Sequence, residues 1–148
     1  MSGKICTFFG HRDCPETILQ SLRDTVFHLI LRQGVTHFYV GNHGRFDALV
    51  LRVLREAKEA YPQIRYAVVL AYLPEKKDSD FFSPEETLFP EGIETVPKRF
   101  AILWRNRWMI AHSQYVVTYV THAWGGAVKF AKEAQKKGCI IISLSCRN

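Results

Sequence analysis

The sequence lacks any apolar run of about 18 residues or more, the length that a membrane-spanning helix needs. Its first residues, MSGKICTFFGHRD, lack the charged head, the apolar stretch and the small-residue cleavage site of a secretory signal. There is also no GxSxG motif, no P-loop lysine motif and no GxGxxG fingerprint. We therefore expect a soluble cytoplasmic protein that binds no membrane, and the motifs identify no catalytic nucleophile.

Cysteine is scarce, and its placement argues against a zinc site. The four cysteines form no CxxC pair and lie towards the two ends of the chain: Cys6, Cys14, Cys139 and Cys146. Two of them, Cys6 and Cys139, fall inside apolar runs, where a free thiol behaves as a small hydrophobic side chain. Cysteine and histidine pairs at the spacing of zinc ligands are missing. We expect no bound metal and no required cofactor.

Acidic residues are concentrated in one stretch. Residues 75–94 hold seven acidic residues and two lysines, a local charge of −5, whereas the whole chain has a charge of +6. The rest of the chain therefore carries +11. A body this basic favours an anionic ligand, either a phosphate-bearing small molecule or a nucleic acid. A solvated basic surface that serves solubility explains the charge equally well.

The order of apolar and amphipathic stretches predicts a parallel sheet. Apolar stretches typical of buried strands occupy residues 5–9, 36–42, 65–74, 115–120 and 139–144. Amphipathic stretches lie between them, at residues 14–33, 45–61, 97–113 and 126–138. Strand–helix–strand connections are right-handed in about 98% of cases. We predict one α/β domain over residues 1–148, a Rossmann-like three-layer α/β/α fold with a mostly parallel five-stranded sheet.

Residues 73–97 interrupt this alternation. They contain four of the six prolines and the exposed-looking aromatics Phe81, Phe82 and Phe89. A loop of this length inside a compact domain is usually a lid, a binding loop or disordered. We predict a partly ordered, acidic, lid-like insertion. Its aromatic residues would serve a homodimer contact equally well.

The helix predicted over residues 97–113 has one broad apolar face. Phe100, Leu103, Trp104 and Trp108 share that face. We expect these four side chains to be buried against the sheet, and the two tryptophans to belong to the core rather than to a ligand platform.

Candidate binding residues follow three of the predicted strands. In an open parallel sheet, the loops at the carboxyl ends of the strands gather at one edge, where ligands bind. These loops supply ten candidates: Gly10, His11, Arg12, Gly41, Asn42, His43, Arg45, Trp124, Gly125 and Gly126. Three further residues are possible contacts: Arg105, His122 and Lys129. We expect strand 5–9 to lie centrally beside strand 115–120, so that Arg12 faces the Gly125–Gly126 turn.

The residue types in these loops suit a phosphate. Glycine lets backbone N–H groups approach an anion, and the helix that starts at Gly126 adds its positive end. Arg12 and Arg45 each offer a planar guanidinium, and Trp124 offers a ring on which a base can stack. Plainer explanations remain open, since a glycine pair also makes a tight turn and loops commonly carry polar residues. Asp47 is the only carboxylate expected at this edge, and a catalytic residue is not otherwise identified.

Three motifs resemble the YpsA-like branch of the SLOG superfamily, the Rossmann-like group named for its Smf/DprA and Lonely Guy members. The motifs are TFFGHR (Thr7–Arg12), VGNHGRFD (Val40–Asp47) and GGA (Gly125–Ala127). The resemblance implies a SLOG fold over nearly the whole chain. It also implies that a nucleotide or a nucleotide-derived ligand binds at the carboxyl edge of the sheet.

The Lonely Guy enzymes, which cleave the N-glycosidic bond of nucleoside monophosphates, are similar over a longer stretch. The sequence RNRWMIAHS matches them at Arg105, Met109 and Ser113, but has Asn106 at the position of their lysine. In WGGAVKFAK the two glycines match, while three later positions differ: Val128 for glycine, Lys129 for threonine and Lys132 for the catalytic glutamate. The resemblance implies a phosphate site without the acid/base machinery.

Three functions remain open. The favoured one is a small module that binds or senses a nucleotide-type ligand without strong catalysis. The second is a nucleotide phosphoribohydrolase-like enzyme that takes its carboxylate from Asp47 or Glu85. The third is a single-stranded nucleic-acid binder, which needs a basic groove with interleaved aromatics. The one compact basic cluster is formed by Lys132, Lys136 and Lys137. These lysines are equally typical of the solvated C-terminal end of a helix.

Overall fold

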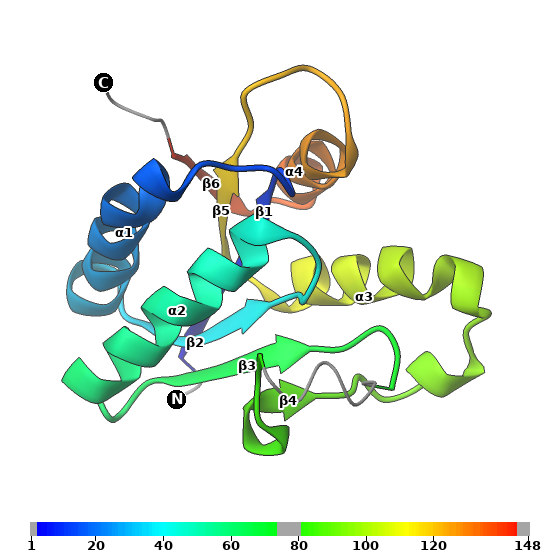
Figure 1. Cartoon of the computed structure of the whole chain (residues 1–148), viewed down its shortest axis with the longest axis horizontal. Coiled ribbons are helices and arrows are strands. Elements are labelled where there is room, and N and C mark those ends of the chain that lie inside the picture. Colours follow the sequence, from blue (N-terminus) through cyan, green and yellow to red (C-terminus); the bar gives the residue numbers. More distant parts are fainter. Residues whose placement is uncertain (1–2, 74–80, 145–148) are drawn as a thin grey trace.

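The computed structural model describes residues 3–73 and 81–144 and forms one parallel sheet with helices on both faces (Figure 1). The strands are β1 (Lys4–Gly10), β2 (Val35–Val40), β3 (Arg65–Val69), β4 (Thr87–Leu88), β5 (Tyr115–Tyr119) and β6 (Ile140–Ser143). Their order is β4-β3-β2-β1-β5-β6, and neighbouring strands pair in parallel. The Rossmann-like α/β fold is confirmed. Over residues 3–73 and 81–144 the sheet has six strands, so the prediction of five was wrong.

The four long helices form the outer layers, two on each face of the sheet. On one face lie α1 (Leu19–Arg32) and α2 (Arg45–Ala60), and on the other α3 (Lys98–His112) and α4 (Gly126–Lys136). The central strand β1 shows why both faces of the sheet are covered by helices. Its side chains alternate, so Phe8 belongs to the core under α1 and α2, and Phe9 to the core under α3 and α4. A strand buried on both faces must be apolar throughout.

The first helix begins later than the sequence predicts. A short 3₁₀ turn, η1 (Glu16–Ile18), precedes α1, and Pro15 before it is extended, with φ −77° and ψ 151°. Side-chain capping hydrogen bonds are missing at the starts of both η1 and α1. The segment from His11 to Cys14 instead forms a turn, because the N–H of Cys14 donates to the carbonyl oxygen of His11. The predicted start near Cys14 was therefore wrong.

The extra strand comes from the segment predicted as an insertion. Residues 74–80 of that segment, like Cys146 at the chain end, lie outside the described residues. The remainder holds two 3₁₀ turns, η3 (Pro84–Glu86) and η4 (Ile93–Thr95), and β4, which pairs with the end of β3. Phe82 and Ile93 are buried and anchor this remainder to the body of the protein, whereas Phe81 and Phe89 are exposed. The predicted lid is not confirmed.

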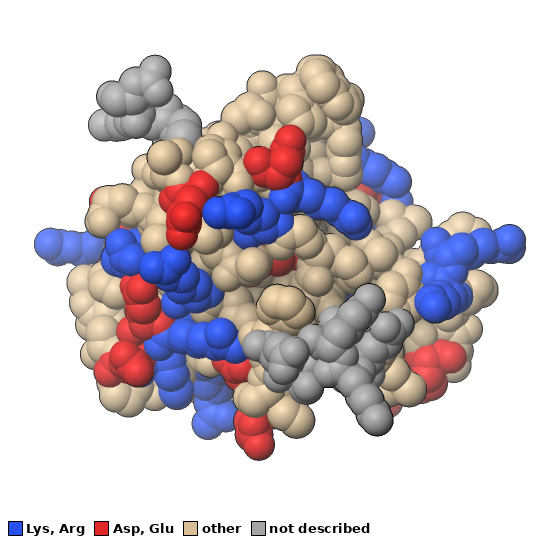
Figure 2. All heavy atoms as spheres, in the orientation of Figure 1, with Lys and Arg blue, Asp and Glu red and all other residues tan. Residues whose placement is uncertain are grey.

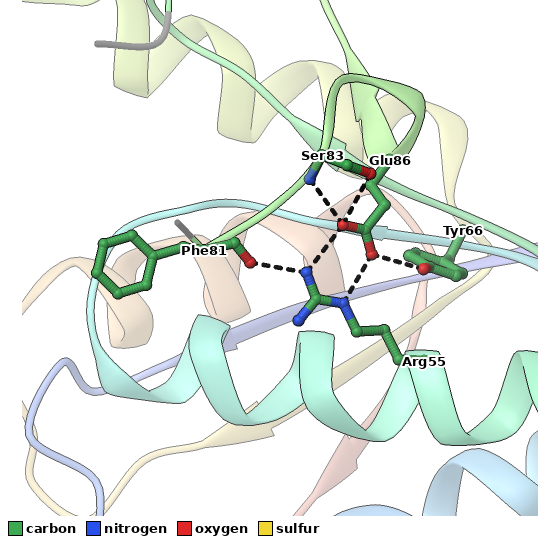
Figure 3. Close-up of polar contacts among 5 residues, drawn as sticks. All are labelled: Arg55, Tyr66, Phe81, Ser83 and Glu86. Atoms are coloured by element: carbon green, nitrogen blue, oxygen red, sulfur yellow. Dashed lines mark hydrogen bonds and ion pairs between the residues drawn. The ribbon is translucent and has the colours of Figure 1, made fainter. Parts of the chain in front are cut away.

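One carboxylate fixes η3 and β4 to the sheet edge (Figure 3). Glu86 accepts hydrogen bonds from Arg55 Nε at 2.7 Å and Nη2 at 2.8 Å, and from the Tyr66 hydroxyl at 2.6 Å. The N–H of Ser83 donates to Glu86 at 2.9 Å, and Arg55 Nη2 also donates to the carbonyl oxygen of Phe81 at 2.7 Å. These bonds lower the pKa of Glu86 to about 2, with Arg55 as the main cause. The guanidinium of Arg55 on α2 thus holds residues 81–86, the segment that precedes β4.

Helix α3 buries the predicted apolar face only in part. Its buried residues are Ala101, Arg105, Asn106, Met109 and Ile110. Phe100 is 46% exposed, while Trp104 and Trp108 are only partly buried. The physical reason is that Arg105 satisfies its guanidinium inside the protein, so a polar pair faces inward and the aromatics flank it. The predicted burial was therefore wrong for Phe100, whereas Leu103, Trp104 and Trp108 pack against the core as predicted.

None of the helices in residues 3–73 and 81–144 has both the length and the apolar content that crossing a bilayer requires.

We expect Glu86→Gln to lower the free energy of unfolding at pH 6 by on the order of 1 kcal/mol, a value reduced because Arg55 is partly exposed. The pKa of Glu86 is depressed from 4.5 to about 2, so its contribution is complete above pH 4.5 and is lost as the pH falls towards 2. Urea unfolding at pH 6 and pH 3 measures this. The matched control is Glu85→Gln on the same turn. An equal difference from wild type at both pH values would contradict the assignment.

Candidate functional site

The strand order creates the site. The chain builds the sheet from β1 outwards in one direction through β2 and β3, and then returns to the other side of β1 with β5. This reversal is the switch point at which open α/β sheets bind ligands. The loops that follow β1 and β5 lie together at the top of Figure 1. With the loop after β2 they enclose a cleft of about 370 Å³.

Eleven residues singled out from the sequence line this cleft: Gly10, His11, Arg12, Gly41, His43, Asp47, Arg105, His122, Trp124, Gly125 and Gly126. Three candidates are not among the lining residues. Asn42 lies beside Arg105, Arg45 lies 3.5 Å from Glu16, and the Lys129 ammonium lies over the ring of Phe130. Asp13, Ile102, Asn106 and Met109 also line the cleft but were not among the candidates. For Asn106 and Met109 a signal was present, because both lie in the RNRWMIAHS stretch that matches the Lonely Guy enzymes.

Three aromatic rings form a stack along one wall. The rings of His11 and His122 lie 3.6 Å apart at 19°, and His122 lies 4.1 Å from the Trp124 ring at 25°. His11 is 7% exposed, whereas Trp124 is 70% exposed. The stack therefore runs from the core to the surface. The outer ring is open to solvent at the mouth of the cleft.

His11 holds the loop after β5 in place. The N–H of Thr121 donates to His11 Nε2 at 2.9 Å, so that nitrogen carries no proton and the neutral ring holds its proton on Nδ1. Burial and the neighbouring His122 lower the pKa of His11, while Asp13 raises it. His11 is thus neutral at pH 7. Nδ1 is the nitrogen through which it can donate to a ligand.

His122 has a buried ring nitrogen, Nδ1, without a hydrogen-bond partner among the described residues. A buried nitrogen without a partner is unfavourable, because it has lost its hydrogen bonds to water. His122 lines the cleft as a residue, and this nitrogen lies buried behind its wall.

Two glycines allow the loops to pack closely. A Cβ on Gly10 would lie 2.3 Å from the ring of Phe46 on α2. Gly44 has φ 92°, and a Cβ there would lie 2.6 Å from Cγ of Arg12. The N–H of Arg45 then donates to the carbonyl oxygen of Arg12 at 2.9 Å. These contacts join the loops after β1 and β2, and so they position Arg12.

Gly125 and Gly126 are not closely packed, unlike Gly10 and Gly44. Gly125 has φ 103°, and a Cβ on Gly126 would meet open space. No side chain caps the start of α4. The first N–H groups of a helix lack partners within the helix, and they carry its partial positive charge. The turn therefore presents open donors to the cleft, as an anion site requires.

Arg105 is a buried cation in the wall of the cleft. It is 2% exposed, and all three guanidinium nitrogens are bonded. Nη1 donates to the carbonyl oxygen of Val69 at 2.8 Å and to Oδ1 of Asn42 at 3.3 Å. Nη2 lies 3.1 Å from His43 Nδ1, and Nε donates to Oδ1 of Asn106 at 2.7 Å. Burial lowers its pKa, while the nearby Asp47 raises it. The guanidinium thus links α3, β3 and the loop after β2.

Asp47 places a carboxyl group near the two cations Arg105 and Arg12. It is half-buried, and its Oδ2 accepts the N–H of His43 at 3.0 Å. Burial raises its pKa to about 6, although this hydrogen bond, Arg105 and Arg12 lower it. A Cβ on Gly41 would lie 2.9 Å from Oδ2, so a larger residue there would require the carboxyl group to shift. Asp47 can therefore change protonation near neutral pH.

The cleft as a whole favours an anion. Arg12 is exposed, and its guanidinium makes no ion pair with any described residue. Together with Arg105 and the start of α4, it supplies positive charge to the cleft, beside the carboxyl groups of Asp13 and Asp47. Across residues 3–73 and 81–144, no three His, Cys, Asp or Glu side chains gather into a possible metal site.

A known structure shares this fold. The chain is similar to DNA processing protein A (DprA) from Streptococcus pneumoniae, with a TM-score of 0.67 and 12% identity. The similarity covers 95% of this chain and 50% of that one, so the chain spans about half the length of that protein. No protein-family model and no curated protein matches the sequence. At this identity the likeness shows the fold alone.

We expect Gly10→Ala to lower the free energy of unfolding by about 1–3 kcal/mol, because the added methyl group would overlap the ring of Phe46. The control is Gly126→Ala, which has open space and a helical position. That change should leave stability equal or up to about 1 kcal/mol higher. Thermal unfolding compares the two variants. Equal losses would show that the loops are not packed as described.

Proposed function

We propose that the protein binds or senses a nucleotide or a nucleotide-derived ligand in the cleft, without catalysing a reaction on it. The observation that carries this proposal is that the unpaired guanidinium of Arg12 and the open start of α4 at Gly125–Gly126 line the same cleft. Both groups bind phosphate, one as a planar double donor and the other as a set of backbone N–H groups. We further propose that the chain belongs to the YpsA-like branch.

The size and the walls of the cleft support a small ligand. Its volume of about 370 Å³ is within the range of small-molecule sites. The rings of Trp124 and His122 line the same cleft as the phosphate-binding groups, and the ring of Trp124 is exposed. These features suit a ligand that joins a phosphate to a polar and partly aromatic body.

The third hypothesis, single-stranded nucleic acid, has less support. The protein with the similar fold is named a DNA processing protein, and this raises the possibility. However, Glu133 lies within the α4 basic cluster and pairs with Arg107 at 2.9 Å. Acidic and basic side chains also alternate over α1 and α2 in Figure 2. A strand-binding groove needs a continuous basic path with aromatics along it.

We expect Arg12→Ala to weaken nucleotide binding roughly 10- to 100-fold, because it removes a charge-assisted hydrogen bond. Calorimetric titration with AMP, GMP, CMP, UMP and ADP-ribose measures the affinity. The control, Arg45→Ala, removes a neighbouring guanidinium that does not line the cleft, and should change binding less than twofold. Either no binding at millimolar ligand or binding insensitive to Arg12→Ala would contradict the proposal.

A second candidate function is cleavage of a glycosidic bond, with Asp47 as the general acid. The observation in its favour is that Asp47 lies in the cleft and has a pKa of about 6, near the pH at which general acids work. The other carboxylate considered, Glu85, is exposed and lines neither this cleft nor its neighbour. Lys132, at the position of the Lonely Guy glutamate, is exposed on α4.

If this second function holds, the protein will release free base from a nucleoside monophosphate, and Asp47→Asn will reduce the rate at least 100-fold. An acid with a pKa of about 6 is protonated at lower pH, so the rate will fall as the pH rises through 6. Chromatography of the released base at pH 5 and pH 7.5 tests this, with Glu85→Gln as the control. The absence of turnover with every common monophosphate would exclude it.

A further inference from the structure

A second cavity lies next to the cleft. Its volume is about 420 Å³, and its walls come from the loop after β2, from α2 and from the segment before β4. Gly41 and Asp47 line both this cavity and the first one. The two spaces therefore adjoin at the start of α2. None of the functions proposed above uses the second cavity.

The walls of the second cavity differ in chemistry from those of the first. Leu51, Val68 and Phe82 are buried and give it an apolar floor. The ring of Phe81 is 66% exposed at its border. The backbone there is held in place, because Arg55 Nη2 donates to the carbonyl oxygen of Phe81 at 2.7 Å. An apolar floor with an aromatic border suits a flat heterocyclic ring.

Polar groups at the junction suit the sugar and the edge of a base. Asn42 lines the second cavity, and its Oδ1 accepts a hydrogen bond from Arg105, which leaves its amide N–H groups as donors. The carboxylate of Asp47 lies between the two cavities and can accept hydrogen bonds from hydroxyl groups. Phosphate, sugar and base would thus each meet groups of matching chemistry.

We propose that the second cavity binds the base of a nucleoside phosphate whose phosphate lies in the first cleft and whose sugar contacts Asp47. This inference rests on the proposed function and assigns the parts of its ligand. The competing surface for the base is Trp124. Its ring is 70% exposed and already has His122 against one face, so a base there would remain mostly in water. The second cavity removes more apolar surface from water.

Two alanines on α2 give a matched test. Ala48 is exposed and lines the second cavity, whereas Ala60 is exposed at the other end of the same helix. Ala48→Phe fills the cavity, and Ala60→Phe is the control. Thermal unfolding verifies that both variants fold. Calorimetric titration then compares ribose 5-phosphate and adenosine with AMP, GMP, CMP and UMP.

We expect wild-type protein to bind at least one of the four monophosphates tenfold or more tightly than ribose 5-phosphate. Ala48→Phe should abolish this tenfold advantage and change the affinity for ribose 5-phosphate less than twofold. Ala60→Phe should change neither affinity. The inference is overturned if the base adds no affinity, if Ala48→Phe leaves the base contribution intact, or if Trp124→Ala removes that contribution instead.

The same titrations separate this inference from the proposed function. If adenosine binds and Ala48→Phe weakens it, while Arg12→Ala and added inorganic phosphate have no effect, the phosphate site fails and the second cavity stands. If ribose 5-phosphate binds and depends on Arg12, but the base adds nothing, the phosphate site stands and the second cavity fails. If none of the compounds binds at millimolar concentration, both fail.

Discussion

The burial of Arg105 is the constraint on which the site depends. A charged group that is only 2% exposed must have every nitrogen bonded, because an unpaired buried charge is strongly destabilising. Its partners lie at the end of β3, in the loop after β2 and on α3 itself. The guanidinium therefore fixes the loop after β2 against the sheet. That loop in turn packs Gly44 against Arg12 and leads directly to Asp47 on α2. The position of Arg12 at the mouth of the cleft therefore depends on the buried Arg105.

His11, which the sequence makes conspicuous, does not supply charge to the site. Burial lowers the pKa of His11, whose ring accepts a backbone N–H and holds the loop after β5. The positive potential comes from Arg12, Arg105 and the start of α4. Asp47 opposes it, and because burial raises its pKa to about 6, this opposition weakens as the pH falls through 6. The cleft thus combines fixed positive charge with one carboxyl group that titrates near neutral pH.

Much of the fold and most of the cleft lining could be predicted from the sequence. Apolar stretches that end in glycine mark central strands, and topology brings their loops together, as Arg12 and the Gly125–Gly126 turn illustrate. Features set by contacts between distant residues could not be predicted in this way. The two-residue strand β4 is held through Glu86 and Arg55, which are 31 residues apart. On α3, periodicity favoured the aromatic face, whereas hydrogen bonds to distant backbone turned Arg105 inward. Gly10 reads as a turn residue, but its role is to admit the ring of Phe46.

The central claim is that Arg12 and the start of α4 form one phosphate site. The most direct measurement is a two-dimensional amide NMR titration of the full chain with AMP and with inorganic phosphate. The account predicts that the largest shifts occur at the amides of Arg12, Gly125, Gly126 and Ala127, which line the same cleft. Shifts confined to the Lys132–Lys137 end of α4, or no shift at millimolar ligand, would contradict it.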